Sequence, residues 1–254
     1  MLGRVLGPAA VFVAVLGLWS LVSYVILPEQ RRFLVPPPGD VFAAALTGPE
    51  AAHMWSALGR TTVVALVGLA IAFVVGVGWA VVMSQARWIE NSLFPYAVVL
   101  QCIPILAVVP VVGFWFGFGF VSRVLVCVLI ALFPIVSNTL FGLRSVDVGH
   151  RDLFALHCTS RWVRLRKLEI PSALPGLFAG LRISAGLSVV GAVVGDFFYK
   201  QNSPGIGILM DTYRARRESA ELFAAASLAS LLGVSVFVVF GWIGQRVVGR
   251  WSRA

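Results

Sequence analysis

The chain has 254 residues, of which 59% are hydrophobic and 12% are Asp, Glu, Lys or Arg. Because this is about half the charged fraction of a typical soluble domain, composition excludes an ordinary water-soluble enzyme. The mean hydropathy of +0.92 excludes intrinsic disorder. The net charge of +9 does not indicate a nucleic-acid partner, because the basic residues form no dense run that would follow a phosphate backbone. Composition therefore predicts a membrane protein with several spans.

Six apolar segments are long enough to cross a bilayer, which takes roughly 20 mostly apolar residues. The fifth contains Arg182, which lies near one end and can extend its guanidinium toward the interface. The first is expected to remain as an anchor, because it is too long for a signal-peptide core and lacks a small-residue cleavage site. We therefore predict a single all-α transmembrane domain over 1–254, with spans at about 7–28, 60–85, 92–116, 122–143, 175–198 and 221–245.

The basic residues predict the orientation of these spans. With the N-terminus inside, 12 of the 20 Lys and Arg residues fall in inside segments, and seven of the 11 acidic residues fall outside. The positive-inside rule then places both termini and the long loop 144–174 in the cytoplasm. In the first outside loop, Asp40 is in position to cap a short helix over 41–46.

Several kinds of chemistry find no support in the sequence. Without a G-x-x-x-x-G-K-[ST] motif, the chain does not hydrolyse nucleotide by the P-loop route. The three Cys and three His show no metal-ligand spacing, so neither a metal nor a cofactor is expected on this chain. Apart from Glu221 at the boundary of the last span, Asp196 is the only acid within a predicted span, which disfavours an ion-coupled carrier. It either pairs with Lys200, one turn later, or takes part in a gate at the outer end.

Small and polar residues mark the interior of the predicted spans. A stripe with four-residue spacing in the fifth span predicts close helix packing, either within this chain or against a partner: Gly176, Gly180, Ser184, Ser188 and Ala192. Prolines predict kinks in the third and fourth spans. Candidates for the translocation path are Gln101, Asn138, Ser184 and Ser188, although interhelical hydrogen bonds would explain the same side chains.

Loop 144–174 carries the most specific pattern. An acid, Asp152, begins a short helix-like segment, and an amphipathic basic segment ends at Ile170-Pro171. This arrangement predicts a compact protrusion, although a basic loop lying on the membrane surface has the same composition.

These residues resemble the cytoplasmic coupling loop of binding-protein-dependent ATP-binding-cassette importer permeases. In the loop and the span after it, the resemblance rests on Ser160-Arg161-Trp162, Ile170-Pro171 through Pro175-Gly176, and Gly180-Leu181-Arg182. Further motifs, in the order typical of the nitrate, sulfonate and taurine branch, are Phe33 to Val41, Ile103-Pro104, Trp115 to Gly119, Phe133-Pro134, Gly142 to Asp147 and Gly205-Ile206-Gly207.

The resemblance implies a transport subunit of the bacterial cytoplasmic (inner) membrane rather than an enzyme. It implies a second permease subunit, expected to be a copy of this chain, and two ATPase subunits that carry ATP and Mg²⁺. It also implies an extracytoplasmic solute-binding protein, with the lipid bilayer as surroundings. Substrates allowed by the resemblance are a nitrate-, sulfonate- or taurine-like anion and a pyrimidine- or flavin-type heterocycle. A stand-alone secondary carrier or channel and a membrane anchor of another complex are the alternatives.

The resemblance also implies a coupling helix that docks on the ATPase. This chain has Asp152-Leu153-Phe154 where the family usually has Glu-Ala-Ala, which predicts a bulkier knob and a matching pocket on the partner. Cys158 stands at a family glycine, where a left-handed turn would be costly for a residue with a side chain. The expected docking residues are Asp152, Leu153, Phe154, Ala155, His157, Cys158, Thr159, Ser160, Arg161 and Trp162.

Overall fold

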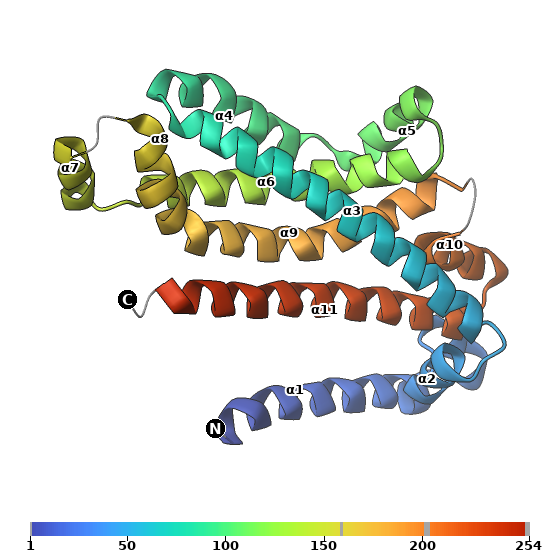
Figure 1. The fold of residues 1–254 in the computed structure, drawn as a ribbon. Coiled ribbons are helices and arrows are strands. Elements are labelled where there is room, and N and C mark those ends of the chain that lie inside the picture. Colours follow the sequence, from blue (N-terminus) through green and yellow to red (C-terminus); the bar gives the residue numbers. More distant parts are fainter. Residues whose placement is uncertain (1, 158–159, 201–203, 252–254) are drawn as a thin grey trace. The chain divides into compact units, whose positions relative to one another are not determined.

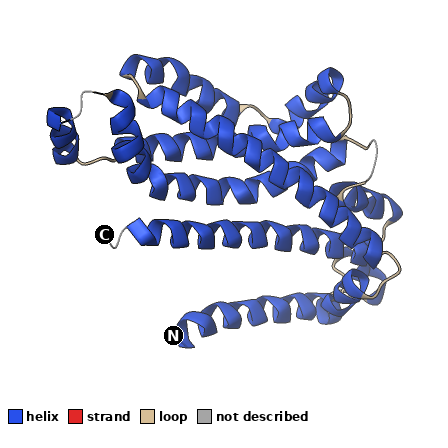
Figure 2. Cartoon of the chain, in the orientation of Figure 1, coloured by secondary structure: helices blue, strands red, loops and turns tan. Residues whose placement is uncertain are grey.

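The computed structural model describes residues 2–157, 160–200 and 204–251. Throughout these ranges the chain consists of helices joined by short loops and contains no strand (Figures 1 and 2). Five helical stretches in the described part are long and apolar enough to cross a bilayer, and a bent pair of shorter helices would make a sixth. This confirms the predicted all-α membrane fold.

The chain forms two compact units, which are described separately. Unit 1 comprises Met1–Arg60 and Ser203–Ser230, and unit 2 comprises Thr61–Asn202 and Leu231–Ala254. Two long helices, α3 (Ala51–Ser84) and α11 (Ser219–Trp251), contribute to both units.

Unit 1 contains α1 (Leu2–Leu21), α2 (Pro38–Leu46), α10 (Ile206–Arg216) and the first parts of α3 and α11. Side chains tie its connections together. Ser23 Oγ donates to the Val35 carbonyl at 2.8 Å, and Arg60 Nε donates to the Pro204 carbonyl at 2.7 Å. Burial, followed by the negative charge of Glu50, raises the pKa of Tyr213 to about 12. The phenol therefore stays protonated at physiological pH and donates to Glu50 at 3.4 Å.

Helix α2 begins earlier than the sequence predicts. The prediction of a helix over 41–46 capped by Asp40 is wrong, because the helix starts at Pro38 and Pro37 is its N-cap. Proline suits the first helical position, where its missing N–H has no intrahelical acceptor and its fixed φ is already helical. Asp40 lies instead within the first turn, where the helix dipole favours a negative charge.

Unit 2 is built around the pair α6 (Phe120–Arg144) and α9 (Ile170–Phe198). The stripe of small residues on α9 faces α6. A Cβ added to Gly180 would lie 2.5 Å from the Pro134 carbonyl oxygen, and one added to Gly176 would lie 2.6 Å from that of Asn138. Only glycine permits such a close approach of the two backbones. The stripe therefore packs within this chain.

The predicted third span, 92–116, is divided between two helices. Helix α4 (Arg87–Cys102) and helix α5 (Ile105–Phe116) meet at an angle of 98°. Proline at 104 removes a backbone donor, and its ring disfavours helical geometry at Ile103, which is extended with ψ of 125°.

The segment between α6 and α9 contains α7 (Val148–His157) and α8 (Arg161–Arg164). A π-helical turn over Leu165–Glu169 joins α8 to α9, so that helix is continuous over Arg161–Phe198. We call the end of unit 2 that carries this segment the loop end. There α3 and α6 finish, and α4 and α9 begin (Figure 1).

Candidate functional site

Helix α7 presents apolar side chains to its surroundings. The helix begins after Asp147, whose Oδ1 accepts a hydrogen bond from the Gly149 N–H at 2.8 Å. Leu153 is 57% exposed and Leu156, three residues later, is 80% exposed; Trp162 in α8 is 72% exposed. Exposed apolar side chains on a segment outside the apolar spans make it a candidate for an interaction site.

The predicted docking residues divide between these two helices. Asp152 through His157 lie in α7, Ser160 is the N-cap of α8, and Arg161 and Trp162 begin that helix. Within α7, Asp152 is exposed and Phe154 is half-buried. Cys158 and Thr159 lie outside the described residues. Leu156 lies within the range implied by the resemblance but was not among the residues singled out, although its i, i+3 spacing from Leu153 indicates that the two share a helix face.

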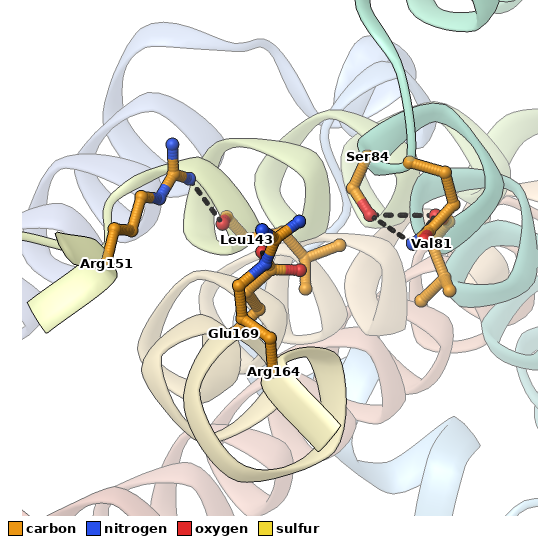
Figure 3. A network of polar contacts seen from close by, with 7 residues as sticks. Val81, Ser84, Leu143, Arg151, Arg164 and Glu169 are labelled. Atoms are coloured by element: carbon orange, nitrogen blue, oxygen red, sulfur yellow. Dashed lines mark hydrogen bonds and ion pairs between the residues drawn. The ribbon is translucent and has the colours of Figure 1, made fainter. Parts of the chain in front are cut away.

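Polar contacts fix the base of this segment at the loop end. Glu169 is buried and accepts from Arg164 Nε at 3.0 Å, and Arg151 NH2 lies 3.5 Å from the Leu143 carbonyl (Figure 3). Leu165 packs in a buried cluster with Leu143 and Ala173. Apolar contacts therefore hold the start of the α9 stretch to α6, whereas the Arg164–Glu169 ion pair lies within that stretch.

A second charged cluster lies at the opposite end of unit 2. Asp196 is fully buried near the end of α9, and its Oδ1 lies 3.2 Å from NH1 of buried Arg123 in α6. Thr61 Oγ1 donates to Asp196 Oδ2 at 2.7 Å, and Arg123 NH2 donates to the Tyr199 carbonyl at 2.6 Å. Lys200, proposed from the sequence as a partner of Asp196, is exposed just after α9.

Arg123 was missed as a site residue. In the sequence it only separates two apolar segments. A signal was nevertheless present, because a single Arg at the start of the fourth span and a single Asp at the end of the fifth lie at the same end of antiparallel helices.

The four candidate path residues occupy different environments. Ser184 Oγ donates to the Ala131 carbonyl at 2.6 Å, and Ser188 Oγ donates to the Ala185 carbonyl at 2.9 Å. Asn138 Nδ2 donates to the Pro134 carbonyl at 2.8 Å. Both serines are buried, and the Ser184 bond joins α9 to α6. Gln101 instead is exposed near the end of α4.

Gln101 lines a cavity of about 470 Å³ at the bend between α4 and α5. Its other lining residues come from α5, α6, α9 and the bend, and they are aliphatic or aromatic apart from Pro134. Among the lining residues there is no charged side chain: Leu100, Gln101, Ile103, Ile105, Val108, Leu129, Ile130, Phe133, Pro134, Leu187 and Val190.

The chain is an all-helical membrane protein that carries, between two of its spans, a short helix with exposed leucines. Residues 68–251 match the model of the family described as binding-protein-dependent transport system inner membrane component. The chain belongs to this family and is a multi-pass inner-membrane permease subunit of an ATP-binding-cassette importer.

Three relatives are named as transport permease proteins, and each matches this chain over most of both sequences. The riboflavin transport system permease protein RibX of Chloroflexus aurantiacus is 31% identical over 90% of this chain and 84% of its own. The formylaminopyrimidine transport permease protein ThiX of Halalkalibacterium halodurans is 29% identical over 92% and 91%. The putative aliphatic sulfonates transport permease protein SsuC of Escherichia coli is 28% identical over 95% and 90%. The chain is therefore a transport subunit and not itself an enzyme.

Proposed function

We propose that two copies of this chain form the translocation path of an importer, with the loop end and both termini in the cytoplasm. Two ATPase subunits, which bind ATP and Mg²⁺, dock on α7 and α8, and an extracytoplasmic binding protein delivers a small solute to the other side. The observation that carries the proposal is the exposure of Leu153, Leu156 and Trp162 on a short helical protrusion, in a chain that belongs to a permease family.

The helix that follows the protrusion could transmit a displacement from the ATPase into the membrane. Because helix is continuous from Arg161 to Phe198, a displacement of α8 is passed along the length of α9. Close packing at Gly176 and Gly180 makes α6 move with α9. Closure of the ATPase pair on ATP would therefore shift this helix pair as one body and change the access of the path.

Leu153→Asp tests the docking surface. The substitution places a charge on an exposed apolar position, so it should abolish co-purification of the ATPase and ATP-driven uptake without changing membrane insertion. Leu34→Asp is the matched control, because Leu34 is similarly exposed, at 53%, in unit 1. Retention of the ATPase by the Leu153→Asp protein would contradict the docking proposal.

The cavity at the α4–α5 bend favours a heterocycle of the pyrimidine or flavin type as the solute. Its walls are apolar, and Gln101 supplies an amide that can both donate and accept hydrogen bonds. A planar ring with a few polar edge atoms matches such a lining, which is the usual character of a small-molecule site. A nitrate- or sulfonate-like anion is the alternative, and the exposed arginines at 214, 216 and 217 are the observation that favours it.

Uptake by the reconstituted importer distinguishes the two solute classes. We expect uptake of a flavin or an aminopyrimidine, and about a tenfold loss with Gln101→Leu, which keeps the size of the side chain but removes its hydrogen bonds. Gln30→Leu, at an exposed amide in unit 1, is the control. Uptake of an alkylsulfonate or nitrate alone would contradict the heterocycle assignment.

A further inference from the structure

A polar cavity of about 610 Å³ opens at the loop end of unit 2, where α3 finishes and α4 begins. Three arginines line it, Arg87 from α4, Arg144 from the end of α6 and Arg151 from α7, together with Glu90 and Glu169. Figure 3 shows some of its lining residues, with Ser84 of α3 on one side and Arg151 and Glu169 on the other.

Both acids of the cavity already have basic partners. Glu90 forms an ion pair with Arg144, and Glu169 forms one with Arg164, which is not itself a lining residue. Arg87 and Arg151 have no carboxylate within ion-pair distance among residues 2–157, 160–200 and 204–251. The nearest acceptor to Arg151 is the Leu143 carbonyl, at 3.5 Å. The cavity therefore holds two uncompensated guanidinium groups that converge on one space.

The position of the cavity indicates which anion it receives. Trp88, next to Arg87, is 71% exposed, and tryptophan with arginine at the end of an apolar helix is typical of the interface between hydrocarbon and water. The cavity lies where the apolar helices α3 and α6 finish, which is the level of lipid headgroups. Arginine forks bind phosphate oxygens in pairs, and basic pockets between membrane helices bind anionic headgroups.

We propose that this cavity binds a phosphate group, supplied by the headgroup of an anionic phospholipid, through Arg87 and Arg151. Arg144, held by Glu90, forms the wall between them. The bound headgroup would link α4 to α7 and so fix the base of the protrusion. The proposal requires only that the loop end faces a bilayer surface. It does not depend on the solute or on the ATPase, so it can fail while the proposed function stands.

Lipid retention by the purified full-length chain tests the site. Native mass spectrometry would count the phosphatidylglycerol or phosphatidylcholine molecules that each protein keeps from vesicles of either lipid. We expect selective retention of phosphatidylglycerol, reduced about 30-fold in the Arg87→Gln/Arg151→Gln variant, as removal of two interfacial charges predicts. The Arg31→Gln/Arg216→Gln variant, which loses two exposed arginines of unit 1, should retain the lipid. Unchanged thermal unfolding of both variants in phosphatidylcholine would show that each one folds.

Three results would overturn the proposal. Equal loss of phosphatidylglycerol from both double variants would show a general charge effect. Displacement of the lipid by millimolar inorganic phosphate would assign the cavity to the free anion. Unchanged lipid retention, with loss of ATPase co-purification in the Arg87→Gln/Arg151→Gln variant, would show that the cavity is part of a protein interface.

Discussion

Arg123 and Asp196 join α6 to α9 through a fully desolvated ion pair. A buried pair of this kind gains little over apolar side chains of the same size, because both charges lose their hydration. The removal of one partner is different, since it leaves a single charge in an apolar setting. The pair therefore specifies how the two helices meet more than it adds to stability.

Asp196→Asn should consequently destabilise the protein more than the loss of both charges. We expect the single variant to lose about 3–5 kcal/mol of unfolding free energy, because Arg123 keeps its charge without the carboxylate. The double variant Arg123→Met/Asp196→Leu should recover most of that loss. Thermal or denaturant unfolding in detergent measures both values. A double variant less stable than Asp196→Asn would show that the pair itself supplies the stability.

Individual polar residues were partly predictable from the sequence. Asp196 stands out as an acid inside the predicted fifth span, but its partner depends on which helix lies beside α9, and no local pattern gives that information. Ser184 and Gln101 were both candidates for the path, yet Ser184 lies between two helices and Gln101 lines a cavity. Residue type and depth alone do not separate these two environments.

The spacing of small residues predicts one face of α9 correctly but not its neighbour. Four-residue spacing follows from helix geometry, so the sequence identifies the stripe. The neighbour depends on tertiary packing, and the structure identifies it as α6. The bend after α4 illustrates the same limit. Prolines at 95, 110 and 134 lie inside helices, whereas Pro104 accompanies a break between two of them.

Gly180→Ala should separate α6 and α9, because the added methyl group would meet the Pro134 carbonyl oxygen and the Asn138 Cβ. Overpacking of this kind costs about 1–3 kcal/mol. Gly186→Ala is a close control on the same helix, since no atom lies within 4 Å of its added Cβ. Thermal unfolding in detergent should show a lower midpoint for Gly180→Ala and no decrease for Gly186→Ala. Equal midpoints would mean that the helices adjust without cost.

At the scale of the whole molecule, the described residues supply a packed helix pair and a short helical segment that we propose as the docking site, and the energy source is expected on another chain. The membrane class follows directly from composition and apolar length, because both are properties of the sequence alone. The proposed contact with the ATPase rests on the exposure of Leu153 and Leu156, which depends on the folded structure and not on composition.

Solute flux should therefore require the complete importer. Proteoliposomes that contain this chain alone should show no uptake above protein-free vesicles, because without the ATPase nothing would drive the proposed motion of α9. The addition of the ATPase, ATP and Mg²⁺ and the binding protein should produce uptake, and Leu153→Asp should return it to background. Vigorous flux through the chain alone would instead identify a channel or secondary carrier. No flux under any condition, with the partners bound, would identify a membrane anchor.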